Sequence, residues 1–170
     1  HGPTLLSLGA SDAQTIESLI KVLAEPSAKL NLEGTTCLIQ GQATGKLMGG
    51  NLSTISHLIG TPYQPEFEGV LLFLEDINEP AYKIDRMLTQ MKMSGCFDGL
   101  KGVILGDFID CQNQEYIDEI FIETFDEFNI PILSGVSAGH GFVNNSFYLG
   151  SDVSLDAASR TVEWKALNHG

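Results

Sequence analysis

The chain has 170 residues, enough for one domain with a hydrophobic core, and 43% of them are apolar, as is usual in globular proteins. Its 22 acidic and 9 basic residues give a formal net charge of −13, which would repel a phosphate backbone, so we expect no nucleic-acid partner. The longest purely apolar run, residues 70–74, is far too short to cross a membrane, so we expect no membrane partner.

The first part of the chain predicts a helix, a strand and a loop. Residues 13–25 predict a capped amphipathic helix that ends before Pro26. Four residues form its apolar face: Ile16, Leu19, Ile20 and Leu23. Residues 35–41 predict a strand that runs into a glycine turn. Residues 42–62 predict a glycine-rich loop that leads into a short helix.

Helices and strands alternate through the rest of the chain. Residues 69–76 predict the most apolar strand, with burial on both faces. Residues 79–97 and 114–129 predict helices, and each is followed by a strand, at residues 100–108 and 130–135. The end of the chain, residues 146–166, predicts two or three short strands around a turn. This order predicts an α/β domain with a small C-terminal β region.

The three cysteines indicate a reducing compartment. Cys37, Cys96 and Cys111 are scattered and odd in number, which argues against a disulfide framework and favours the cytoplasm. We expect all three to be small buried apolar residues. The sequence has no Cys-x-x-Cys or His-x-x-x-His pair, so we expect no structural metal.

A serine in the sequence Gly-Val-Ser-Ala-Gly, residues 135–139, matches the nucleophile elbow of α/β-hydrolases. An elbow needs a strand, a sharp turn and then a helix, but the residues that follow are rich in glycine and asparagine and predict no helix. No good acid and histidine pair follows Ser137 either. We therefore expect Ser137 to be a small residue in a turn. A self-contained esterase that uses Ser137 with His140 is the alternative.

His140 is a stronger candidate for chemistry. It lies between Gly139 and Gly141, just beyond a strand that is predicted to be buried, and loops at strand ends commonly hold catalytic groups. A histidine can also exchange protons near neutral pH. The alternative is a purely structural histidine.

Two carboxylates, Glu75 and Asp76, end the apolar strand at residues 69–76. A carboxylate there could orient a histidine by accepting its N–H, or it could cap a helix. For Asp76 we expect a cap on the helix that begins near Pro80. For Glu75 both interpretations stay open.

The glycine pair in residues 45–53 precedes a predicted helix at Asn51. Backbone N–H groups at such a helix start could hold an anion or a carboxylate. A plain tight turn with Asn51 as the N-cap is an equal alternative. The segment is not a P-loop, because Lys46 precedes the pair Gly49-Gly50 instead of following it.

An ordered set of motifs along the chain resembles one protein family. The motifs are GGNL, GTP, LFLED, IDRML, GVILG and GH, and the match extends back to the opening HGP. Together they resemble the murein LD-carboxypeptidases, a serine peptidase family that includes the microcin C immunity peptidases. The resemblance covers nearly the whole chain, although only the C-terminal one of the family's two domains.

The resemblance implies a fold and a set of site residues. Residues 1–170 would be one C-terminal domain of the swivelling β/β/α type, with a mixed sheet flanked by helices, and the N-terminal domain with the nucleophilic serine would be absent. Glu75 would be the triad glutamate and His140 the general base. Gly49, Gly50 and Asn51 are weaker candidates for contacts to the substrate.

The resemblance also implies an activity. The parent protein would cleave the amide bond to a terminal D-amino acid in murein peptides, without a metal or cofactor, and it would form a homodimer. Alternatives are cleavage of peptidyl-nucleotide conjugates, as in microcin C immunity, a non-catalytic module that binds a peptide or partner, or a piece with no role of its own. We expect the isolated chain to be inactive and to expose an apolar face around residues 72–76 and 49–53.

Overall fold

The computed structural model describes residues 1–25, 30–112 and 114–165. Its centre is a mixed sheet of eight strands in the order β1-β8-β7-β3-β4-β5-β6-β2. The strands are β1 (Asn31–Glu33), β2 (Thr36–Ile39), β3 (Gln42–Asn51), β4 (Val70–Ile77), β5 (Gly102–Ile109), β6 (Ile132–Ser134), β7 (Asp152–Asp156) and β8 (Thr161–Trp164). Strands β3 to β6 run parallel, and antiparallel strands flank them. The predicted α/β class, with a mixed sheet and a C-terminal β region, is confirmed.

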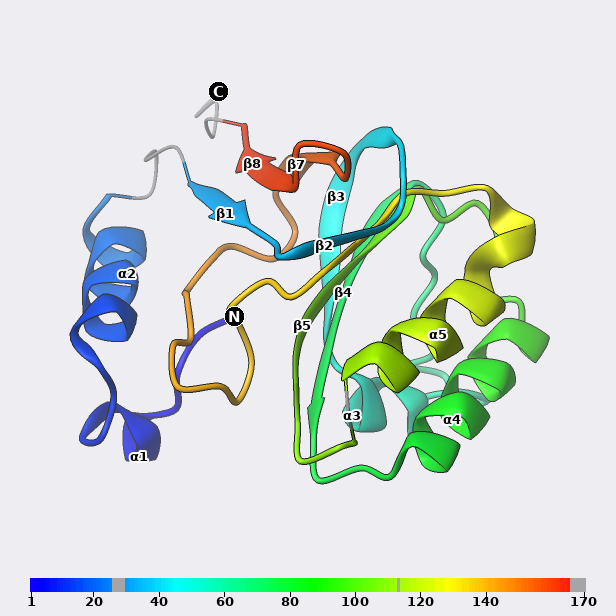
Figure 1. Ribbon diagram of the computed structural model, residues 1–170, viewed down its shortest axis with the longest axis horizontal. Helices are drawn as coiled ribbons and strands as arrows, with labels where there is room; N and C mark the ends of the chain where they lie inside the picture. Colours follow the sequence, from blue (N-terminus) through cyan, green and yellow to red (C-terminus); the bar gives the residue numbers. More distant parts are fainter. Residues whose placement is uncertain (26–29, 113, 166–170) are drawn as a thin grey trace.

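Helices lie on both faces of the sheet. They are α1 (Leu5–Leu8), α2 (Ala13–Ala24), α3 (Leu52–Ser56), α4 (Ala81–Met93), α5 (Gln114–Phe125) and the 3-10 helix η1 (Asp126–Phe128). Figure 1 shows α3, α4 and α5 together on one side of the sheet, while α1 and α2 lie on the other side. None of the helices within the described residues is long and apolar enough to cross a membrane.

Strand β4 explains why the domain has two cores. Its side chains alternate between the faces of the sheet, so Leu72 and Leu74 pack in the core beneath α4 and α5, while Leu71 and Phe73 pack in the core on the opposite face. Every residue from Val70 to Asp76 is buried. The predicted burial of this strand on both faces is confirmed.

Residues 42–51 correct the sequence analysis, because they form a central strand and not a glycine-rich loop. A Cβ atom at Gly49 would collide with the backbone of Phe73, and one at Gly45 would collide with the carbonyl oxygen of Gly69. The glycines therefore let the β3 backbone approach β4 closely, which is a use of glycine that resembles loop composition in the sequence. The pairing sets Asn51 opposite Glu75.

Helix α2 is present as expected, with Asp12 as its N-cap, whereas Pro26 lies outside the described residues. Its predicted apolar face is wrong: Ile16, Ile20 and Leu23 are exposed and Leu19 is half-buried, whereas Thr15 and Val22 are buried instead. The reason is the irregular segment 144–148, whose backbone N–H groups at Asn144 and Ser146 donate to the hydroxyls of Thr15 and Ser18. These hydrogen bonds turn a polar side of the helix inward.

The remaining elements agree with expectation apart from their ends. Pro80 is the N-cap of α4, and Gly95 follows the helix with a left-handed φ of 77°. The C-terminal region contains the two strands β7 and β8, while α1 and β1 were not predicted. Cys96 and Cys111 are buried as expected, but Cys37 is only half-buried.

Candidate active site

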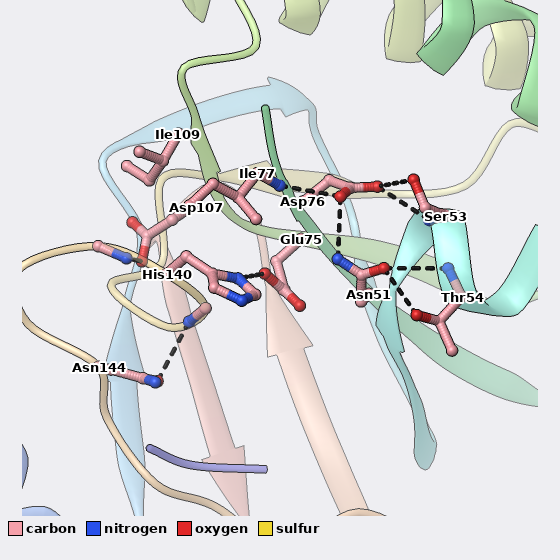
Figure 2. Close-up of polar contacts among 12 residues, drawn as sticks. Asn51, Ser53, Thr54, Glu75, Asp76, Ile77, Asp107, Ile109, His140 and Asn144 are labelled. Carbon is pink, nitrogen blue, oxygen red and sulfur yellow. Dashed lines mark hydrogen bonds and ion pairs between the residues drawn. The ribbon is translucent and has the colours of Figure 1, made fainter. Parts of the chain in front are cut away.

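Glu75 and His140 are 65 positions apart in the sequence and meet near the C-terminal end of β4. The Nδ1 atom of His140 lies 2.7 Å from the Oε2 atom of Glu75. The Glu75 side chain is 3% exposed and the His140 side chain is 44% exposed. Figure 2 shows the imidazole ring directed at the carboxylate. The pair therefore has a buried acid and a histidine that solvent can reach.

This geometry determines which ring nitrogen can act as a base. When Glu75 is ionised, it accepts the Nδ1–H of His140, so that the neutral ring carries its lone pair on Nε2. Within the described part of the chain, Nε2 makes no hydrogen bond. The site can thus take a proton from a group that approaches the exposed edge of the ring.

Because Glu75 is buried, its ionisation depends on its contact with His140. Desolvation raises the pKa of this carboxyl, and the neighbouring charge of Asp76 adds to that effect. The hydrogen bond and the charge of His140 lower the pKa and oppose it. The imidazole is therefore the largest influence that favours the ionised form of Glu75, and Asn51 adds a smaller one.

The loop that carries His140 is held without a helix. The backbone N–H of Gly139 donates to the side-chain oxygen of Asn144, and Asn145 donates twice to the carbonyl of Ser137. Residues 137–148 contain no helix, as expected. Ser137 is exposed, and its hydroxyl makes no hydrogen bond to His140 within the described residues. The strand–turn–helix context of a nucleophile elbow is absent from this part of the chain.

Gly139 provides the close approach between the loop and the carboxylate. Its φ of +134° is one that other residues rarely adopt. A Cβ atom at this position would lie 2.9 Å from Oε2 of Glu75. Glycine is therefore needed beside His140 for both reasons.

Asp76 caps a different helix from the one expected. It accepts hydrogen bonds from the backbone N–H and the hydroxyl of Ser53, both at 2.8 Å, and from the amide of Asn51 at 2.9 Å. These donors lie at the start of α3, whereas α4 begins at Ala81 after its N-cap Pro80 and has no side-chain cap. The reason is the parallel pairing of β3 and β4, which sets the start of α3 beside Asp76, where unpaired helix N–H groups attract a carboxylate.

The candidate substrate residues Gly49, Gly50 and Asn51 lie at the same edge of the sheet as Glu75. The side chain of Asn51 is already engaged, since its oxygen caps α3 at Thr54 and its amide donates to Asp76. The start of α3 thus holds a carboxylate of its own chain. Gly50 has open space where a side chain would project.

One residue of this site, Asp107 on β5, was missed by the sequence analysis. Its Oδ2 atom accepts the backbone N–H of Gly141 at 3.1 Å. Burial raises the pKa of Asp107 to about 6. The signal was available, because Asp107 lies near the C-terminal end of an apolar strand and such ends of neighbouring parallel strands lie side by side. Among the described residues, no cluster of three or more His, Cys, Asp or Glu side chains could hold a metal ion.

Comparison with known proteins agrees with the motifs. Residues 44–155 match the family described as the LD-carboxypeptidase C-terminal domain. The chain belongs to this family. The resemblance inferred from the sequence is confirmed, and the chain spans little more than half the length of three curated relatives that it matches, 54–56%.

Three relatives illustrate the range of the family. A Bacillus subtilis protein named "probable murein peptide carboxypeptidase" is 32% identical over 95% of this chain and 54% of its own length. The microcin C7 self-immunity protein MccF of Escherichia coli is 29% identical over 72% of this chain and 37% of its own. The crystal structure of muramoyltetrapeptide carboxypeptidase from Oxalobacter formigenes has a TM-score of 0.80 at 26% identity, over 96% of this chain and 59% of that one.

Proposed function

We propose that residues 1–170 are the C-terminal domain of a serine LD-carboxypeptidase that cleaves the amide bond to a terminal D-amino acid in murein peptides. The observation that carries the proposal is the contact of 2.7 Å between buried Glu75 and exposed His140, which leaves Nε2 facing outward. The nucleophilic serine would come from an N-terminal domain. The share of the relatives' length that this chain spans supports such a division.

In the first half of the reaction, Nε2 of His140 takes the proton of the serine hydroxyl as the serine oxygen attacks the carbonyl carbon of the substrate. Glu75 holds the ring by accepting Nδ1–H and stabilises the imidazolium that forms. The imidazolium then gives its proton to the nitrogen of the leaving D-amino acid, the C–N bond breaks, and an acyl-enzyme remains.

In the second half, Nε2 takes a proton from water while the water oxygen attacks the ester carbonyl carbon. The C–O bond to the serine breaks, and the serine oxygen recovers the proton from His140. This sequence uses no metal and no organic cofactor. Because the isolated chain would supply the base without the nucleophile, we expect it to be inactive.

The decisive assay uses the complete protein with a murein tetrapeptide and measures release of the terminal D-amino acid. Glu75→Gln and His140→Gln should each lower kcat by about a thousandfold or more, the loss typical of a triad member. Glu119→Gln and His57→Gln are matched controls, because both side chains are exposed, and they should leave kcat unchanged. Full activity of Glu75→Gln would contradict the proposal.

A fluorophosphonate probe tests where the nucleophile lies. It should label a serine upstream of this chain in the complete protein, and His140→Gln should suppress that labelling. The isolated chain should stay unlabelled. Labelling of Ser137 in the isolated chain would instead support the self-contained esterase.

The similarity to MccF favours a second substrate class, peptidyl-nucleotide conjugates. Parallel assays with the murein peptide and such a conjugate would separate the two, since the triad residues should matter equally for both. If the complete protein hydrolyses neither and the probe labels no serine, a module that binds a peptide or partner becomes the better reading. The homodimer and the cytoplasmic location stay predictions.

A further inference from the structure

Strand β5 contains an irregularity directly opposite Glu75. Leu74 of β4 pairs with Leu105, and Asp76 pairs with Phe108, so β5 has one residue more than β4 in this interval. Leu105 and Phe108 both pack in the core beneath α4 and α5, although residues three apart in a regular strand face opposite sides. The extra residue is a β-bulge, a device that often redirects a side chain next to a functional site.

The bulge brings Asp107 to the loop that carries His140. The backbone N–H of Asp107 donates to the carbonyl of Ala138 at 2.9 Å, and its carboxylate accepts from Gly141 at 3.1 Å. One residue thus holds the loop on both sides of His140. Figure 2 shows the side chains of Asp107 and Glu75 near the imidazole, each from its own strand.

Two glycines make this close contact sterically feasible. A Cβ atom at Gly141 would lie 2.6 Å from Oδ2 of Asp107. A Cβ atom at Gly106 would collide with the carbonyl oxygen of Ala138. The approach of β5 to the loop therefore depends on the absence of side chains at both positions.

Asp107 is a partly buried carboxylate that lies close to the charges of Glu75 and His140. Burial raises its pKa, as does the charge of Glu75 on β4, while the N–H of Gly141 and the charge of His140 on the loop lower it. Among the described residues, no lysine or arginine forms an ion pair with it. A partly buried acid without a basic partner lowers the stability of the fold. Proteins tend to keep such a destabilising residue where function needs it.

We propose that Asp107 is a positioning residue of this site, which fixes the His140 ring beside Glu75 and adds a second negative charge that stabilises the imidazolium. The inference rests on the proposed function for its catalytic part. Its structural part concerns this chain alone, so the two can be tested separately.

The positioning is tested by amide hydrogen exchange on the 170-residue chain, read at Gly141 by NMR. Asp107→Ala removes the acceptor, so the Gly141 amide should exchange about tenfold faster or more. Asp107→Asn keeps an acceptor oxygen and should retain most of the protection. Asp126→Asn, an exposed acid, should change nothing. Equal exchange of Gly141 in the wild type and in Asp107→Ala would overturn the positioning role.

The charge is tested by kcat of the complete protein as a function of pH. Asp107→Asn should lower kcat by about tenfold at about pH 8, where the wild-type carboxylate is ionised, with KM little changed. The ratio of the two kcat values should approach one below about pH 5, because the wild type then loses the same charge. A merely structural role would give a ratio that does not vary with pH, and that result would overturn the inference.

The triad variants separate failure of this inference from failure of the proposed function. If His140→Gln and Glu75→Gln are inactive while Asp107→Asn equals the wild type at every pH, Asp107 is not a positioning residue and the triad stands. If His140→Gln retains full activity, the proposed function fails, and with it the catalytic role of Asp107.

Discussion

The helices on the two faces of the sheet are held in place by different means. Beneath α3, α4 and α5 the core is continuous and apolar, and it contains fully buried rings such as Phe97, Phe121 and Phe125. On the opposite face, Thr15 and Val22 are the only residues that α2 buries within its described length. That helix is joined to the 144–148 segment mainly by side-chain hydrogen bonds. The apolar core on this face is built almost entirely from strands and loops. Apolar packing therefore fixes α4 and α5, whereas polar contacts position α2.

The site combines a residue from a buried strand with a residue from a loop that hydrogen bonds hold in place. Glu75 lies on β4, which is buried on both faces, whereas His140 lies on a loop that Asp107, Asn144 and Asn145 hold through hydrogen bonds. The expected apolar surface around residues 72–76 and 49–53 is wrong, because residues 72–76 are buried and so is Leu52, the apolar side chain of the second stretch. Large apolar side chains are exposed elsewhere, for example Leu5, Leu6 and Leu23 on α1 and α2, Met93 at the end of α4, and Phe142 two residues after His140. The carboxylate is thus rigidly placed, and the histidine depends on a few contacts.

The largest expected difference is in the stability that side chains of α5 and of α2 contribute by packing. Phe121→Ala removes a fully buried ring that contacts Phe108 and Phe125, so it should lower the free energy of unfolding by about 3–5 kcal/mol. Leu23→Ala on α2, where the side chain is 72% exposed, should change it by less than about 0.5 kcal/mol. Denaturant unfolding of both variants measures the difference, and similar losses would mean that α2 packs as tightly as α5.

The next effect concerns the junction of the two faces. Gly139→Ala places a methyl group against Glu75 in a strained backbone, so it should cost about 2–3 kcal/mol and displace His140. Gly150→Ala is a matched control, since φ is +80° but nothing lies near the added carbon, and it should cost about 1 kcal/mol. NMR of the imidazole nitrogens should show loss of the Nδ1 hydrogen bond in the first variant alone. An unchanged bond in Gly139→Ala would refute the steric account.

A third test compares the helix caps on the two faces. Asp76→Ala leaves the N–H of Ser53 and the amide of Asn51 without their acceptor, and should cost about 2 kcal/mol. Asp12→Ala removes the cap of α2, which accepts hydrogen bonds from Gln14 and Thr15. Because Asp12 is half-exposed and Asp76 is buried, water can replace more of the lost contacts at Asp12, so its loss should be clearly smaller. Thermal unfolding at one pH gives both values. A larger loss of stability in Asp12→Ala than in Asp76→Ala would mean that the cap of α2 contributes more than the cap of α3.

The sequence predicts those parts of the fold that depend on local pattern. The apolar run of β4 and the periodicity of α4 determine those elements, and both are confirmed. The glycines of residues 42–51 were misinterpreted because a glycine that allows backbones to approach looks the same in the sequence as one that makes a turn. The buried side of α2 depends on hydrogen bonds to a segment about 130 residues away, which no local pattern contains.

The site was less predictable from local sequence patterns than the strands and helices were. Spacing alone could not bring Glu75 to His140, since their contact depends on strand order and on the path of a loop, and the family motifs supplied that pairing. Asp76 was correctly expected to cap a helix, but the choice of helix required the β3–β4 register. Asp107 reaches the site through a bulge, and a bulge depends on how two strands pair rather than on either strand's sequence.

The smallest expected effect is a gain in stability, and it comes from the same residue that is proposed to position His140. Folded Asp107 keeps its proton up to about pH 6, while its ordinary pKa is 3.8. Between these values the folded chain binds more protons than the unfolded chain, so the contribution of Asp107 to stability falls as the pH rises.

Asp107→Asn removes that dependence. The shift corresponds to about 3 kcal/mol in full, and partial exposure of the side chain reduces the expected gain to about 1 kcal/mol at about pH 8. At about pH 3, below both pKa values, the variant and the wild type should unfold at the same denaturant concentration, because this position is then uncharged in the folded and in the unfolded chain. If Asp107→Asn has a lower kcat and is more stable at high pH, the carboxylate of Asp107 serves catalysis at the expense of stability. A loss at every pH would mean instead that the carboxylate serves the fold.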